Sequence, residues 1–201
     1  LSKYNLSTYI SNILILLLIS TFFSFFLISI SYKIILKYFL FQFEWLFIGV
    51  LMSFFLFVTK TNLTLWIADQ NPKYFAFFNI FETIVNLIFS LFLIVILGMH
   101  WEGRLTAIAT STFLMGILSI IFLYTRGYLK FQFNKEYFVD ALKFGVPLIP
   151  HELGFWLRNG AIIILISTLV GSKATGLYTV AFYFSLGITV LVNAFKNVWQ
   201  P

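Results

Sequence analysis

The sequence predicts an all-α, polytopic membrane protein, and both its composition and its hydropathy pattern point to that fold class. Of the 201 residues, 61% are hydrophobic and 10% are charged, and the mean hydropathy is +0.98. Soluble domains carry about 25% charged residues, so a soluble globule of this composition would lack the polar side chains to cover its surface. Six apolar runs reach the ~20 residues that a helix needs to cross a bilayer.

Turn-forming residues separate most of these runs. In chain order, the predicted transmembrane helices are Thr8–Ile30, Glu44–Ala68, Tyr74–Leu97, Gly103–Leu123, Pro147–Val170 and Ala174–Asn197. Asn71-Pro72 lies between the second and third runs, Gly98–Gly103 between the third and fourth, and Gly171–Lys173 between the fifth and sixth. Links this short make sequence neighbours antiparallel hairpins.

The gap between the fourth and fifth runs is longer and charged. It contains Arg126, Lys130, Lys135, Glu136, Asp140 and Lys143. Asn134 suits the N-cap of a short amphipathic surface helix, which Gly145 and Pro147 would end before the fifth span begins. The pattern therefore predicts four helices of a first bundle in residues 1–125, a linker in residues 126–146, and two helices of a second bundle in residues 147–201.

The net charge of +6 comes from Lys and Arg residues scattered between the apolar runs. Scattered cations of this kind orient helices in a membrane and form no dense basic face for a nucleic acid. With the N-terminus and the linker in the cytoplasm, six cations lie on that side and four on the other. The two sets are Lys3, Lys73, Arg126, Lys130, Lys135 and Lys143, against Lys33, Lys37, Arg104 and Lys173.

The sequence offers no catalytic or metal-binding constellation. It has no cysteine, and its two histidines are His100 and His151, which argues against thiol chemistry and against a multi-histidine metal site. Neither a Gly-rich phosphate loop nor a nucleophile paired with a base is evident. We therefore expect no enzyme activity and no cofactor. The start at Leu1 and the lack of a signal-peptide pattern predict an internal piece of a longer protein.

Polar residues inside the predicted spans are the most informative positions, because a charge in a membrane needs a partner or a wet cavity. Lys60, Glu82 and Arg158 lie about 12–16 Å from the same end of their helices, at 1.5 Å per residue, and so at comparable depth. Polar stripes accompany them on the second, third, fifth and sixth runs. The candidate cavity residues are Lys60, Arg158, Glu82, Asn79, Asn86 and Asn159.

Two interpretations of these residues remain open. In the first, the stripes join helices and Lys60 forms a buried structural ion pair with Glu82. In the second, they line a hydrated central cavity whose cations bind an anionic group. A helix bundle without an internal cavity would not need polar faces on four of its helices, and this favours the second interpretation.

Three segments carry a resemblance to a known family. They are Gly98–Ala107 (GMHWEGRLTA), residues 128–144 followed by Gly145–His151 (GVPLIPH), and Gly171–Ala181 together with Phe195–Pro201. In this order they resemble the hairpin before the sixth helix, the linker with the start of the seventh helix, and the eighth helix of bacterial polysaccharide flippases. These flippases move O-antigen and capsule repeat units and belong to the multidrug/oligosaccharidyl-lipid/polysaccharide exporter superfamily. The first half matches only in hydrophobic pattern and in Asn71-Pro72-Lys73.

The resemblance implies twelve to fourteen helices in two lobes, of which this chain supplies helices three to eight. It implies alternating-access flipping of undecaprenyl-pyrophosphate-linked oligosaccharides across the bacterial cytoplasmic membrane. In that setting, Lys60 and Arg158 would hold the pyrophosphate from opposite lobes. Glu82 would pair with Lys60 in one state or bind a coupling H⁺ or Na⁺. Besides this substrate, the expected partners are membrane lipids.

Two other functions compete with flipping. A multidrug/cation antiporter of the same superfamily would use acidic cavity residues for cationic drugs. A membrane-embedded polysaccharide polymerase or acyltransferase would need a large extramembrane loop with catalytic residues, which this stretch of sequence lacks.

Overall fold

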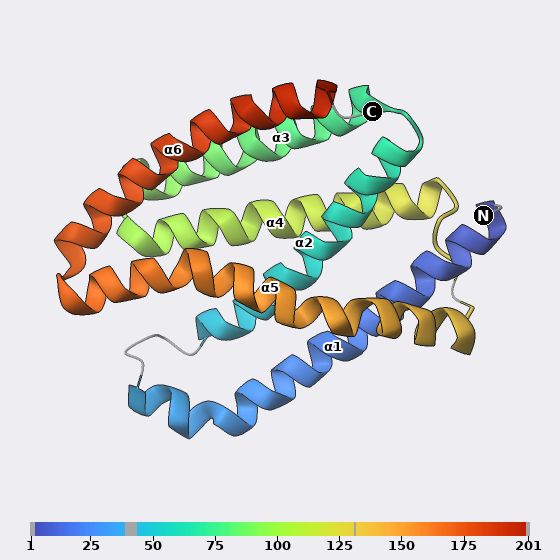
Figure 1. The fold of residues 1–201 in the computed structure, drawn as a ribbon, viewed down its shortest axis with the longest axis horizontal. Helices are drawn as coiled ribbons and strands as arrows, with labels where there is room; N and C mark the ends of the chain where they lie inside the picture. The colour runs from blue at the N-terminus through green and yellow to red at the C-terminus, as the bar shows by residue number, and fades with distance from the viewer. Residues whose placement is uncertain (1–2, 39–43, 131, 200–201) are drawn as a thin grey trace. The chain divides into compact units, whose positions relative to one another are not determined.

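The computed structural model describes residues 3–38, 44–130 and 132–199, and this described part is helical apart from short connections (Figure 1). The helices are α1 (Lys3–Tyr38), α2 (Glu44–Ala68), α3 (Pro72–Leu91), the π-helical turn η1 (Phe92–Ile96), α4 (His100–Thr125), α5 (Lys135–Leu169) and α6 (Ser172–Trp199). The all-α fold class is confirmed.

Five stretches of these helices are long and apolar enough to cross a membrane. They are Leu6–Tyr32, Glu44–Ala68, Pro72–Ile96, His100–Thr125 and Lys135–Leu169. Each contains or matches one of the predicted spans to within a few residues. The sixth predicted span, Ala174–Asn197, is observed as the helix α6, several of whose side chains lie outside the described part. The chain is thus a multi-pass membrane protein.

The chain divides into two compact units, residues 1–141 and residues 142–201. In the first unit, α4 packs against both α2 and α3, and α1 packs against α2. Small buried residues on α4 allow this close approach: Gly103, Ala107, Ala109, Ser111, Gly116 and Ser119. Met115 and Leu123, two larger side chains of α4, are fully buried. α4 is therefore the central helix of the first unit.

The predicted break at Gly145 and Pro147 is wrong, because α5 runs without interruption from Lys135 to Leu169 and contains Pro147 and Pro150. Each proline removes one backbone N–H, but neighbouring hydrogen bonds hold the helix on either side, as membrane helices commonly tolerate. The surface helix and the fifth span are therefore one element. The N-cap prediction is confirmed: the Asn134 side-chain carbonyl accepts the N–H groups of Glu136 and Tyr137, at 2.9 and 3.4 Å.

A polar face of α1 holds the segment before α5 in place. Asn12 is fully buried, and its amide donates to the Gln132 carbonyl at 3.0 Å while its side-chain oxygen accepts the Asn134 N–H at 2.9 Å. The hydroxyl of the preceding residue, the buried Ser11, accepts the Lys130 N–H at 2.8 Å. Side chains of α1 thus satisfy the backbone of this extended segment, which no neighbouring helix backbone could do.

Replacing Asn12 with alanine should loosen this segment, because the Gln132 carbonyl and the Asn134 N–H would each lose a partner. A buried backbone group left unsatisfied costs about 1–3 kcal/mol, and the cost here lies toward the low end because Gln132 is exposed and Asn134 half-buried. We expect a lower midpoint of thermal unfolding and faster proteolysis within residues 128–134. Limited proteolysis of the full protein in detergent measures this, with the exposed Ser29→Ala as the control. Equal cleavage of N12A and the wild type would contradict the prediction.

Candidate functional site

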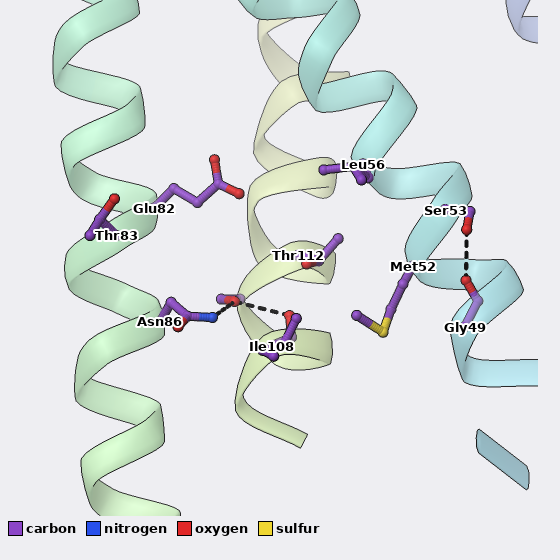
Figure 2. A pocket seen from close by; sticks show the side chains of 10 residues that line it. Gly49, Met52, Ser53, Leu56, Glu82, Thr83, Asn86, Ile108 and Thr112 are labelled. Atoms are coloured by element: carbon purple, nitrogen blue, oxygen red, sulfur yellow. Dashed lines mark hydrogen bonds between the residues drawn. The ribbon is translucent and has the colours of Figure 1, made fainter. Parts of the chain in front are cut away.

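A partly open cavity of about 500 Å³, with a mainly apolar surface and a few polar groups, lies between α2, α3 and α4 of the first unit (Figure 2). Its lining combines apolar side chains with hydroxyl, amide and carboxyl groups. The lining residues are Gly49, Met52, Ser53 and Leu56 from α2, Glu82, Thr83 and Asn86 from α3, and Ile108, Ser111 and Thr112 from α4. A concave site with a few polar groups among apolar walls is typical of a binding site for a small group.

Glu82 provides the charge in this cavity. Figure 2 shows its carboxyl extending from α3 toward α4 and α2. It is half-buried, and it is the ionisable residue among the lining residues. The other polar groups of the wall are neutral, so the cavity carries a negative charge whenever Glu82 is ionised. A site of this kind suits a proton or a small cation.

A hydrogen-bond network fixes the wall one turn beyond Glu82. Asn86 donates from its amide to the Ser111 hydroxyl at 2.9 Å, and that hydroxyl donates to the Ile108 carbonyl at 3.0 Å. Arg104, near the start of α4, donates to the Asn86 side-chain oxygen at 2.8 Å and to the Ser90 hydroxyl. The Asn86 amide is thus held with its nitrogen toward α4. Arg104 connects this wall of the cavity to the end of the α3–α4 hairpin at which α4 begins.

The structure separates Lys60 from Glu82. Lys60 is exposed on α2, one turn past the cavity residue Leu56 on the same face, and it does not line the cavity. Within the described residues the two side chains form no ion pair, so the structural pair that the sequence suggested is not made in this conformation. Asn79 donates to its own helix, at the Phe75 carbonyl, and does not line the cavity either.

Arg158 and Asn159 lie on α5 in the second unit, and the side chains of both are outside the described part of the chain. Their proposed place opposite Lys60 stays a prediction. Of the six candidate residues, Glu82 and Asn86 are the two that the structure brings into one cavity.

A second polar cluster, which sequence reasoning missed, joins the α2–α3 turn to the end of α4. The Arg126 guanidinium forms an ion pair with Asp69 and donates to the buried Asn62 side-chain oxygen at 3.1 Å. The Tyr128 hydroxyl donates to the Asp69 carboxylate, at 3.0 and 2.9 Å to its two oxygens. Burial, and after it the Asp69 carboxylate, raises the pKa of Tyr128, so this hydroxyl stays protonated and able to donate.

Different signals marked the residues that were missed. The hydroxyl run Thr110-Ser111-Thr112 in the fourth span indicated a polar face on α4, and two of its members line the cavity. Arg104 and Arg126 counted only as loop cations, because no sequence pattern links them to Asn86 or Asp69 across 18 and 57 residues.

Comparison with known proteins places this arrangement in a family. No curated protein and no solved structure gives a significant match. The sequence profile of a family described as polysaccharide biosynthesis proteins matches residues 2–201. Because that match spans nearly the whole chain, this multi-pass membrane protein belongs to the polysaccharide biosynthesis protein family.

Proposed function

We propose that the chain is part of a transporter, not an enzyme, that flips undecaprenyl-pyrophosphate-linked oligosaccharide repeat units across the bacterial cytoplasmic membrane by alternating access. The observation that carries the proposal is the cavity that Glu82, Asn86 and several hydroxyl groups help to line between three apolar helices of a polysaccharide biosynthesis family protein. A purely structural bundle would fill such a space with apolar side chains, since an ionisable group is costly in a membrane.

In this proposal, Glu82 and the cationic residues have separate tasks. Lys60 on the exposed face of α2 and Arg158 on α5 bind the pyrophosphate, and each contributes a positive charge. Glu82 binds the coupling cation in the cavity of the first lobe, where the Ser53, Thr83 and Thr112 side chains also line the wall. Binding a cation there changes the charge between α2, α3 and α4, which biases the lobe toward one of its two states.

Substitutions at these charges test the proposal in the full-length protein. Lys60→Ala and Arg158→Ala should abolish surface polysaccharide, because the pyrophosphate loses a cationic partner. Glu82→Gln should reduce it at least tenfold, because the amide cannot release a proton or neutralise a cation. The measurement is surface polysaccharide in a deletion strain that carries each variant, at equal amounts of protein in the membrane.

The control for these variants is Lys173→Ala, which removes an exposed cation at the start of α6 and should leave surface polysaccharide unchanged. Wild-type polysaccharide in K60A, R158A and E82Q would refute the assigned roles. Wild-type polysaccharide in the deletion strain itself would refute the function.

One observation favours a second candidate function. The charge that lines the cavity is a carboxylate, and a multidrug/cation antiporter would use such a group to bind a cationic drug. In that case the deletion strain should become more susceptible to cationic drugs and dyes and should keep its polysaccharide. The two functions thus predict opposite phenotypes for one strain.

A further inference from the structure

A second pocket, of about 360 Å³, opens at the end of the first unit where α2 meets α3 and α4 ends. Three of its lining residues are aromatic: Trp66, Tyr74 and Phe122. Four are polar: Asp69, Asn71, Thr125 and Arg126. It shares no lining residue with the Glu82 cavity. It lies at the helix ends next to the linker, and so at the membrane surface.

The polar groups of this pocket are held rigidly. The Arg126 guanidinium lies 5.4 Å from the Trp66 ring and 4.8 Å from the Tyr128 ring, besides its bonds to Asp69 and Asn62. Asp69 is fixed in turn by the Tyr128 hydroxyl. A side chain that is already immobilised loses little entropy when a ligand binds to it. The arrangement is therefore preorganised.

The charges of the pocket cancel. Arg126 and Asp69 are the charged groups that line it, and they are paired with each other. A phosphate would meet the Asp69 carboxylate, and an ammonium group would meet the Arg126 guanidinium. The chemistry that fits both groups together is a neutral ligand with many hydroxyl groups, whose oxygen atoms accept from the guanidinium and whose O–H groups donate to the carboxylate.

The aromatic walls supply the other half of this recognition. Trp66 is 4% exposed, because the Arg126 guanidinium lies over its ring and Tyr74 stacks on it with the ring centroids 6.1 Å apart. Tyr74 is 58% exposed and provides the aromatic surface that a ligand can reach. A pyranose ring presents C–H groups on its faces and hydroxyls around its edge, so an aromatic face and planar polar groups complement it. Asn71 is the N-cap residue of α3, but its side-chain amide makes no capping hydrogen bond, so its donors and acceptor can turn to a ligand.

We propose that this pocket binds a neutral sugar residue of the lipid-linked oligosaccharide. The pocket lies beside the linker that the charge pattern places in the cytoplasm, where the glycan would be met before translocation. Sugar binding there is separate from charge binding at Lys60, Glu82 and Arg158. The proposal rests on the proposed function for the source of the sugar, but not for the binding itself.

The test uses the full-length protein in phosphatidylcholine nanodiscs and a panel of free sugars: glucose, galactose, mannose, rhamnose, N-acetylglucosamine and N-acetylgalactosamine. Saturation-transfer NMR should detect binding of at least one of them. Asn71→Ala and Tyr74→Ala, two exposed residues that leave the Arg126–Asp69 pair intact, should each weaken that signal at least fivefold. Lys73→Ala is the matched control: Lys73 is exposed and lies between these two residues in the sequence but does not line the pocket, so this variant should retain the signal.

The outcomes separate this proposal from the proposed function. No binding of any sugar, or equal binding by the wild type, N71A and Y74A, overturns the pocket assignment. Selective loss in N71A and Y74A upholds it, even where a deletion strain keeps its polysaccharide and the flippase function fails. Competition of the sugar signal by phosphatidylethanolamine added to the nanodiscs, with no loss in N71A, would assign the pocket to a lipid headgroup and overturn it.

Discussion

Replacing Gly116 with alanine should separate α2 from α4 and destabilise the first unit by about 1–3 kcal/mol, the usual cost of overpacking a core. A Cβ atom at this position would lie 2.5 Å from the Cβ and 2.8 Å from the Cγ of Phe55. Because the Phe55 Cβ is fixed to the backbone, rotating that side chain cannot relieve the clash, and the helices themselves must move apart. Thermal unfolding of the full protein in detergent should show a lower midpoint.

Gly49 provides the matched control on α2. A Cβ atom added there meets no atom within 4 Å, so Gly49→Ala should keep or slightly raise the unfolding midpoint, since alanine favours a helix over glycine. The two Gly→Ala changes are thus expected to have opposite signs. A midpoint for G116A equal to or above that of the wild type would show that α2 and α4 do not approach as closely as described.

Replacing Arg126 with methionine should cost about 2–4 kcal/mol, because one side chain serves several partners and breaking a partly buried ion pair strands the other charge. The Arg126 and Asp69 side chains are 20% and 39% exposed, so the cost falls short of that of a fully buried pair. The largest part of this cost would come from Asn62. It is fully buried, its oxygen accepts from Arg126, and its amide nitrogen has no partner among the described residues.

Lys73→Met is the control for this change, because it removes an exposed cation from the same end of the bundle. It should shift the free energy of unfolding by less than about 0.5 kcal/mol. Arg126→Lys should restore only part of the loss, since an ammonium group cannot bond two acceptors and stack between two rings as a guanidinium does. Unfolding midpoints in detergent measure all three variants, and full stability in R126M would contradict the assigned role.

The helices themselves could be predicted from the sequence, because bilayer thickness sets their length and lipid contact sets their composition. The span Glu44–Ala68 was predicted with the bounds that are observed. The break at Pro147 was not observed, because a proline signal reports a lost N–H but not whether the surrounding bonds hold the helix together. The same reasoning that found the Asn134 cap therefore misplaced the end of its helix.

The site was partly predictable for a related reason. Glu82 and Asn86 stood out because polar residues at helical spacing are rare in an apolar run. Their surroundings depend on which helix faces them, and hydropathy carries no information on that. The sequence placed Lys60 and Glu82 at the same depth, but Lys60 is exposed outside the cavity lining, so depth alone suggested a pair that the described residues do not form. Arg104 and Arg126 show the same limit for long-range partners.

Because α5 is continuous, its first part and its membrane span belong to one helix. The part from Lys135 to Pro147 is ~18 Å long, at 1.5 Å per residue. Its start is held to α1 by the Asn12 side chain, which accepts the Asn134 N–H, and by a 3.3 Å hydrogen bond from Tyr9 to Asp140. A tilt of ~10° at Pro147 would displace the start of α5 by ~3 Å, which is further than hydrogen bonds of ~2.9 Å can stretch. The contacts with α1 therefore hold the start of α5, and a displacement of this size would break both hydrogen bonds.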